Sequence, residues 1–452
     1  MNWITKRAIK AASLGGSGRI LGNALGLLIT SSLAHNVTDI ALSTYFLAIT
    51  YASIISIIIQ LGTPEILARF AGEKVNRGNE TSALQIGATI VLTSAGFISI
   101  LALSTYILLS LLNTLFSLPS VIYVYTVFWG LALASLNNNC EFFRTFHFHK
   151  RFAIHLYVSQ NIFFLSLITI IRLNGNTLGP EGILACGISS TLLALLLSSI
   201  EIATITKSSG FKLRILSKKE INKYLKFGIP NSLNNLTNAI ISNIDLIIMG
   251  ALSSPSQTAA YGIATRLVRL AGIPIVMAAV SLPSTMSNLL FRDKKNYLQL
   301  LIKQTSSILL TISSSLFLGI AAFGKPLILF LFGEGFDPAY LYFLILFTGK
   351  ILSIYIGPAS YLLTIAGLGQ TMLKLNIIFS ITLIAAGAAV TSFVGGAGMA
   401  IAVAVIGTWQ YYAFYRLAQK KIGISTNASC SIALRLAKRL INIRAGKSYK
   451  CS

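Results

Sequence analysis

Long apolar segments recur along this sequence, separated by short polar stretches. A helix needs about 20 consecutive apolar residues to cross the hydrocarbon core of a bilayer. Twelve segments reach this length, at approximately residues 13–33, 40–66, 82–108, 118–136, 152–172, 181–203, 228–250, 258–287, 303–323, 339–364, 372–391 and 397–417. The pattern therefore predicts an all-α polytopic membrane protein with about twelve transmembrane helices.

The charged residues support this class. They make up 11% of the chain, whereas a soluble protein carries about 25%. The net charge of +24 does not indicate nucleic-acid binding, because the basic residues lie mostly in short loops and in the tail. Lys6, Arg7 and Lys10 precede the first apolar segment, and no small-residue cleavage site follows it, so we expect a retained helix rather than a signal peptide.

The distribution of basic residues predicts the orientation. Most of the 36 lysines and arginines fall in the tails and in loops on one side, whereas only Arg172 and Lys325 fall in loops on the other. Cytoplasmic loops are enriched in these residues, so both termini are predicted to be cytoplasmic. The longest basic loop divides the chain into a six-helix lobe at 1–206, a linker at 207–226, a second six-helix lobe at 227–418 and a basic tail at 419–452.

The two halves show a weak internal repeat. Tyr45 and Pro64 occupy the second segment of the first half, and Tyr261 and Pro283 occupy the second segment of the second half. Equal numbers of helices give both copies the same orientation, so the repeat is predicted to be parallel, with its axis along the membrane normal.

Polar residues concentrate in the seventh and eighth segments. A stripe at helical spacing consists of Asn231, Asn234, Asn238, Ser242 and Asp245. Arg266 and Arg269 share a face of the next segment. An ionisable group at membrane depth costs roughly 2.5–3.5 kcal/mol and usually faces a water-filled cavity. We interpret these residues as the wall of a central polar cavity, with Asp245 as the group for ion coupling or charge pairing; the alternative is two helices joined by buried polar contacts.

The first segment carries a similar combination. Gly18, Gly22 and Gly26 permit close helix contact. Arg19 and Asn23 lie beside them and are further candidates for the cavity wall, as is Lys350 in the tenth segment. For Arg19 the alternative is a side chain that reaches the cytoplasmic surface.

The sequence contains little that predicts catalysis or metal binding. Cys140, Cys186, Cys430 and Cys451 are scattered, and the loop with His147, His149 and His155 lacks partners at metal-ligand spacing. The stretch at 319–326 matches part of a phosphate-binding loop but lacks its Ser or Thr. We therefore expect a transporter rather than an enzyme, with no metal and no cofactor apart from a coupling ion, H+ or Na+.

Two stretches, Leu42–Glu73 and Phe227–Ser287, resemble the polysaccharide-transporter branch of the multidrug/oligosaccharidyl-lipid/polysaccharide (MOP) exporter superfamily. The resemblance implies two lobes around a central cavity that opens alternately to each side. Lipid-II flippases of this superfamily carry cavity arginines in their first, second and eighth helices. Here Arg19 and Arg266 match the first and eighth, but the second segment has no arginine before Arg69 and the two additional helices are absent.

The resemblance implies a flippase for an undecaprenyl-pyrophosphate-linked oligosaccharide, such as an O-antigen unit of lipopolysaccharide or another surface polysaccharide, in the bacterial inner membrane. A polysaccharide polymerase and a chain-length regulator are the protein partners expected. The alternative is a cation or multidrug antiporter on the same scaffold. Four cations against one acid at membrane depth favour the flippase, since Arg and Lys bind pyrophosphate through charge-assisted hydrogen bonds. A lipid-binding protein without transport remains a third interpretation.

Overall fold

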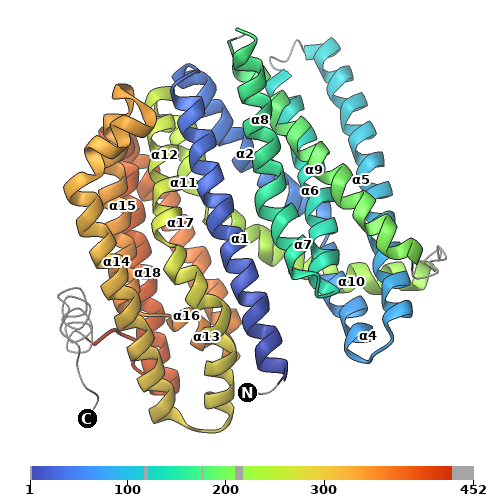
Figure 1. Ribbon diagram of the computed structural model, residues 1–452. Coiled ribbons are helices and arrows are strands. Elements are labelled where there is room, and N and C mark those ends of the chain that lie inside the picture. The colour runs from blue at the N-terminus through green and yellow to red at the C-terminus, as the bar shows by residue number, and fades with distance from the viewer. Residues whose placement is uncertain (1–2, 117–120, 176, 209–216, 430–452) are drawn as a thin grey trace, which may run out of the picture. The chain divides into compact units, whose positions relative to one another are not determined.

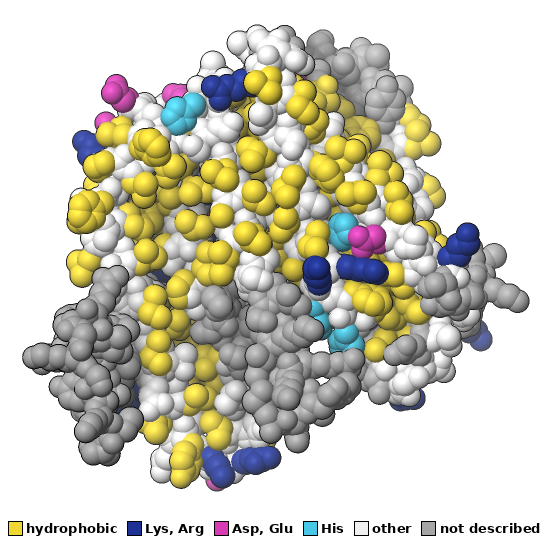
Figure 2. All heavy atoms as spheres, viewed as in Figure 1, with side chains coloured by type: hydrophobic (Ala, Val, Ile, Leu, Met, Phe, Trp, Pro, Cys, Tyr) yellow, Lys and Arg dark blue, Asp and Glu magenta, His cyan; other side chains and the backbone are white. Residues whose placement is uncertain are grey.

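A computed structural model describes residues 3–116, 121–175, 177–208 and 217–429 (Figure 1). Every regular element within these ranges is helical. The contacts divide the chain into a first unit, Met1–Ile247, and a second unit, Ile248–Ser452. Figure 2 shows apolar side chains spread widely over the face in view, with charged side chains in a few small groups. The all-α prediction is confirmed.

The first unit contains the helices up to α10. Their bounds are α1 Trp3–Ala34, α2 Asp39–Gln60, α3 Thr63–Ile66, η1 Leu67–Ala71, α4 Gly72–Asn76, α5 Glu80–Phe116, α6 Val121–Thr145, α7 His149–Ala153, η2 Ile154–Ser159, α8 Gln160–Leu173, α9 Pro180–Ser208 and α10 Lys218–Ile241. Helix α6 packs against α2, α5 and α9. It buries Trp129, Phe142 and Phe143 almost completely, so it forms the centre of this unit.

The second unit contains the helices after α11, which itself spans the boundary at Ile244–Leu252. Their bounds are α12 Pro255–Ala271, α13 Ile273–Phe291, α14 Lys295–Phe332, η3 Glu334–Phe336, α15 Asp337–Ile356, α16 Ala359–Ile365, α17 Gly369–Val394 and α18 Gly396–Ile422. Helices α15 and α18 pack along each other, with α12 and α14 against α15 and α17 against α18. Phe343, Phe347 and Met399 are fully buried among them.

Within the described residues, all twelve predicted segments fall on helices; residues 118–120 of the fourth segment lie outside them. Eight helical stretches in the described residues are each long and apolar enough to cross a membrane, and a ninth arises if α10 and α11 form one bent span. The other predicted segments correspond to α1, to α6 and to the pair α12 and α13. The eighth predicted segment divides at Gly272, two residues before Pro274, and the tenth divides at Gly357 and Pro358. Proline removes a backbone hydrogen bond and so kinks or ends a helix.

The seventh predicted segment differs most from expectation. The chain bends by 51° between α10 and α11, and α10 runs crosswise to α5, α8 and α9 (Figure 1). Residues 218–226, predicted as linker, are the first turns of α10, which begins with a capping box at Ser217 and Glu220. Pro230 lies inside α10.

Helix α10 packs against the hinge between α2 and α3. Leu61 and Gly62 adopt the left-handed conformation there. A Cβ atom on Gly228 would lie only 2.6 Å from the Leu61 carbonyl oxygen, so the two backbones touch directly. This contact explains why the compact units divide at Ile247, later in the chain than the predicted linker.

Candidate functional site

The glycine stripe of α1 contacts α7 and η2, as the sequence predicts. A Cβ atom on Gly18 would lie 2.8 Å from Ala153 Cβ, and one on Gly22 would lie 2.7 Å from the Tyr157 carbonyl oxygen. Arg19 is exposed beside this contact. Its Nε donates to Tyr157 Oη at 2.9 Å, and its guanidinium carbon lies 5.7 Å from the centroid of the same ring. The phenol therefore holds Arg19 in place while leaving it accessible.

The remaining polar candidate of α1, Asn23, is also exposed. It lies one turn from Arg19 on the same helix, so both side chains are available to a ligand at the surface of the first unit.

The three asparagines of the predicted stripe lie on α10 and differ in exposure. Asn234 and Asn238 are exposed, whereas Asn231 is half-buried and donates to the Phe227 carbonyl oxygen at 2.8 Å. The prediction that Asp245 continues this stripe is wrong, because the helix ends at Ile241 and the chain bends before α11. Asp245 instead lies in the first turn of α11, where its Oδ1 accepts from the Leu246 amide at 2.9 Å. A carboxylate at a helix N-terminus is stabilised by the helix dipole.

The two arginines of α12 lie in its less buried C-terminal part. Arg266 is half-buried and Arg269 is exposed, whereas the preceding stretch Thr258–Ala264 is buried throughout. Both guanidinium groups therefore remain accessible on the second unit, and neither is enclosed in its apolar core.

Lys350 lines a small pocket of about 100 Å3 in the second unit. Its neighbours in the pocket include the hydroxyl-bearing residues Ser306, Ser353, Tyr361 and Tyr411, and none of the lining residues in the described part of the chain is acidic. A lysine among hydroxyl groups can bind an anion without competition from a fixed carboxylate.

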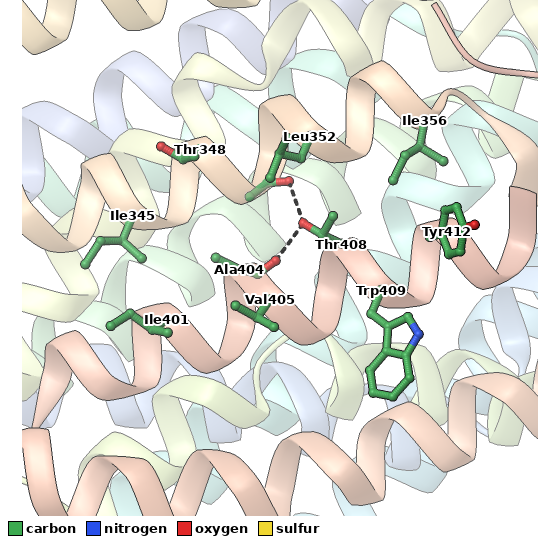
Figure 3. A pocket seen from close by; sticks show the side chains of 11 residues that line it. Ile345, Thr348, Leu352, Ile356, Ile401, Ala404, Val405, Thr408, Trp409 and Tyr412 are labelled. Atoms are coloured by element: carbon green, nitrogen blue, oxygen red, sulfur yellow. Dashed lines mark hydrogen bonds between the residues drawn. The ribbon is translucent and has the colours of Figure 1, made fainter.

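An apolar groove lies along α15 and α18 (Figure 3). Its volume is about 640 Å3, and Leu352, Val405 and Trp409 are among its residues. The Thr408 hydroxyl already donates to the Ala404 carbonyl oxygen at 2.6 Å. The groove thus presents hydrocarbon and aromatic surface, in contrast to the polar pocket around Lys350 on the same helix.

The first unit contains polar contacts that the sequence does not predict. Trp129 Nε1 and Gln160 Nε2 both donate to Thr191 Oγ1, at 2.9 and 2.8 Å. Asn235 donates to Glu65 Oε1 at 2.6 Å, which joins α10 to α3. Asn235 lies one residue beside the predicted stripe, and only the crosswise course of α10 brings it to Glu65.

The first unit also contains a buried glutamate. The Glu141 side chain is 7% exposed and lies 2.9 Å from Arg144 Nη2. The spacing of three residues predicts a pair on one helix face, but it does not predict that the acid is buried.

The prediction that His155 lies in one loop with two other histidines is wrong. His155 does not share a loop with His147 and His149; it lies in the π-helical turn η2 and is 3% exposed. Its Nε2 is 3.4 Å from Glu201 Oε1, and the other oxygen of Glu201 is 3.3 Å from Arg151 Nε. Tertiary packing of η2 against α6 and α9 places the imidazole inside the unit.

Solved structures share this fold. A MATE transporter of Vibrio cholerae, VcmN, in a mutant form is 15% identical, with a TM-score of 0.61 over 92% of this chain and 97% of that one. An inward-facing multidrug resistance MATE transporter of the MOP superfamily is 14% identical, with a TM-score of 0.69 over 92% and 98%. A MOP superfamily transporter of Pyrococcus furiosus, also 14% identical, gives a TM-score of 0.62 over 92% and 96%.

Comparison at the level of sequence gives the family. No curated protein matches the chain. A family described as "Polysaccharide biosynthesis protein" matches residues 10–289, which is more than half of the sequence. The chain therefore belongs to the polysaccharide biosynthesis protein family, and its helices adopt the fold of the MOP-superfamily transporters.

Proposed function

We propose that the protein is a flippase for an undecaprenyl-pyrophosphate-linked oligosaccharide, such as an O-antigen unit or another surface glycan, in the bacterial inner membrane. The observation that carries the proposal is the accessibility of the four predicted cavity cations. Arg19 and Arg269 are exposed, and Arg266 and Lys350 are half-buried. Accessible cations can bind a pyrophosphate, and membership of the polysaccharide biosynthesis family supports a glycan as the remainder of the substrate.

In this mechanism the cationic and the amide side chains perform different tasks. The arginines and Lys350 hold the pyrophosphate, and Asn23, Asn231, Asn234 and Asn238 offer donors and acceptors to sugar hydroxyls. The polyprenyl chain stays in the lipid while the glycan crosses through a hydrated cavity. Several cations at different depths transfer the anion in steps, so that no single site binds too tightly for release.

Alternating access requires a driving force. The sequence has no complete ATP-binding loop, so we propose an H+ or Na+ gradient, or consumption of the product outside. Asp245 is the proposed group for ion coupling or for pairing with a cation. The polymerase and the chain-length regulator of the same glycan are the proposed protein partners.

A cation or multidrug antiporter is the second candidate, because structures of similar fold are described as multidrug resistance MATE transporters. Such a protein needs acids to bind its cargo, whereas the predicted cavity here has one acid, Asp245, among four cations. The Pyrococcus furiosus structure is described as having a binding pocket of reverse polarity that suggests a different function, so the fold itself does not fix the charge of the cargo.

The test is the double substitution Arg266→Ala/Arg269→Ala in cells that lack the chromosomal copy. We expect surface polysaccharide to disappear at a normal level of the protein, because the pyrophosphate loses two charge-assisted contacts of roughly 1.5–3 kcal/mol each. Arg266→Lys should retain partial activity as a point charge. The measurement is surface polysaccharide by gel and lipid-linked units by mass spectrometry.

The matched control is Arg292→Ala/Lys294→Ala, which removes two exposed cations outside the predicted cavity. It should leave the polysaccharide unchanged. Wild-type polysaccharide in the Arg266→Ala/Arg269→Ala strain would overturn the mechanism, and altered resistance to cationic drugs in that strain would favour the antiporter.

A further inference from the structure

A second polar cavity lies within the first unit, between α5, α6 and α9. Its volume is about 580 Å3, and its polar residues include Ser94, Ser99, Ser135, Asn138 and Ser199. We refer to it as the α5–α6–α9 cavity. None of the residues that line it in the described part of the chain belongs to the proposed substrate site, so it needs a separate explanation.

Asn138 presents an acceptor oxygen for which the described residues supply no donor. The residue is 1% exposed, and its Nδ2 donates to Ser94 Oγ at 3.2 Å. Its Oδ1 is buried and has no hydrogen-bond partner among the described residues. A buried carbonyl oxygen without a partner is costly, so a ligand with an N–H or O–H donor would be stabilised at this position.

Three serine hydroxyls of the cavity also present acceptor oxygens. Ser94 donates to the Val91 carbonyl oxygen at 2.8 Å, Ser99 to Ala95 at 2.9 Å and Ser135 to Leu131 at 3.3 Å. Because each hydroxyl proton is used within its own helix, the oxygens retain capacity mainly as acceptors. No acidic residue lines the cavity in the described part of the chain. Ser94 Oγ already accepts from Asn138, and Ser199 Oγ accepts from Asn139 Nδ2 at 2.9 Å, but a hydroxyl oxygen can accept twice. The cavity therefore offers neutral acceptors, which suit a primary ammonium with its three donors.

The rest of the lining adds an anion site and an apolar surface. Lys207 lines the cavity eight residues beyond Ser199, or about 12 Å along α9. Lys207 is exposed, and the Cα–Cβ bonds of a helix tilt toward its N-terminus, which is the direction of the serines. Leu92 and Leu196 also line the cavity and are 50% and 59% exposed, on helices long and apolar enough to span a membrane.

We propose that the α5–α6–α9 cavity binds the headgroup of phosphatidylethanolamine. The lipid's ammonium donates to Asn138 Oδ1 and to the serine oxygens, its phosphate contacts Lys207, and its acyl chains pass over Leu92 and Leu196. A neutral sugar would supply donors but no anion for Lys207. A free phosphate would leave the acceptors unpaired. The aminoethyl phosphate of a membrane lipid supplies both groups and explains the apolar rim.

The experiment compares two lipids whose headgroups differ in the number of N–H hydrogen-bond donors. The full-length protein is purified in detergent, stripped of lipid and titrated with phosphatidylethanolamine or phosphatidylcholine, and retained lipid is counted by native mass spectrometry. Phosphatidylcholine has the same phosphate, but its quaternary ammonium has no N–H. We expect at least a tenfold preference for phosphatidylethanolamine, which corresponds to about 1.4 kcal/mol.

Variants assign the preference to the cavity. Asn138→Leu should abolish the preference, and Ser199→Ala should reduce it and serves if Asn138→Leu fails to fold. Lys207→Gln should weaken both lipids about equally. Asn376→Leu is the matched control, because Asn376, like Asn138, hydrogen-bonds a side chain of a neighbouring helix: its Oδ1 accepts from Gln410 Nε2 at 2.8 Å. Asn376 lies on α17 of the second unit, outside the cavity, so this variant should keep the full preference.

Three results would overturn the proposal. Equal retention of both lipids would mean that the acceptors do not recognise N–H donors. Retention of neither lipid would mean that water alone fills the cavity. An Asn138-dependent rise in melting temperature with Na+ alone would assign the acceptors to a metal cation instead. Each result is independent of glycan transport, so the flippase proposal stands or falls separately.

Discussion

Two arginine–glutamate pairs of the first unit differ in burial more than in geometry. Arg144 lies 2.9 Å from Glu141, and Arg77 lies 2.6 Å from Glu73. The side chain of Glu141 is 7% exposed, whereas that of Glu73 is 54% exposed. The negative charge of Glu65 also repels the carboxylate of Glu141. A charge withdrawn from water depends on its partner, whereas an exposed charge is screened.

We expect Arg144→Gln to destabilise the protein by about 2 kcal/mol, less than the roughly 3–5 kcal/mol for a fully buried pair, because Arg144 itself is 56% exposed. Arg77→Gln should cost at most about 1 kcal/mol. Melting temperature in detergent measures both. The double substitution Glu141→Gln/Arg144→Gln should recover part of the loss. Equal losses for Arg144→Gln and Arg77→Gln would contradict the role of burial.

At the scale of elements, α10 is held to the first unit by backbone contact as well as by side chains. Ser232 Oγ donates to the Ile57 carbonyl oxygen at 3.0 Å, and Arg69 lies over the Phe227 ring at 4.4 Å. Between these contacts, Gly228 faces the turn that follows α2. The position of α10 therefore depends on the absence of a side chain at residue 228.

Gly228→Ala should destabilise the protein by about 1–3 kcal/mol. Its Cβ atom would lie 2.6 Å from the Leu61 carbonyl oxygen and 2.7 Å from Ile66 Cδ1, so the backbone must shift. Gly319→Ala on α14 is the matched control, because no atom lies within 4 Å of its Cβ position. Alanine favours a helix by up to about 1 kcal/mol over glycine, so the control should be neutral or stabilising. If both variants shift the melting temperature in the same direction, the close contact at Gly228 is refuted.

The elements show what a sequence can predict in physical terms. Apolar length predicts the long apolar helices, and the spacing of Gly18 and Gly22 predicts a close helix contact, because both are local properties. The break before Asp245 and the burial of Glu141 and His155 depend on which helix packs against which. The break separates Asp245 from the predicted asparagine stripe, although helical spacing alone places them together. The cavity role of the predicted site residues stays a prediction.

At the scale of the whole molecule, the core packing of the two units supports the internal repeat. Tyr45 of α2 lies 6.3 Å from the Trp129 ring of α6, and Tyr261 of α12 lies 6.1 Å from the Tyr342 ring of α15. Both tyrosines are buried. In each half, the aromatic contact joins the second and the fourth predicted segment. Six helices in each half, an even number, give both copies of the repeat the same orientation. One pair of labelled residues, one on each side of the membrane, therefore tests the predicted orientation.

The orientation predicted from the basic loops places Ser217 in the cytoplasm and Ser254 outside. The two serines are well matched, since each is exposed and each caps a helix by accepting from a backbone amide, Glu220 for α10 and Gln257 for α12. Replacement by cysteine should cost about 1 kcal/mol at either position, so the two variants are comparable in folding. Cys140 and Cys186 are buried, and labelling of the unaltered protein gives the background to subtract.

An impermeant thiol reagent added to intact spheroplasts should label Ser254→Cys and leave Ser217→Cys unlabelled until the membrane is opened. The reverse pattern would invert the orientation and, with it, the direction in which we propose that the glycan moves.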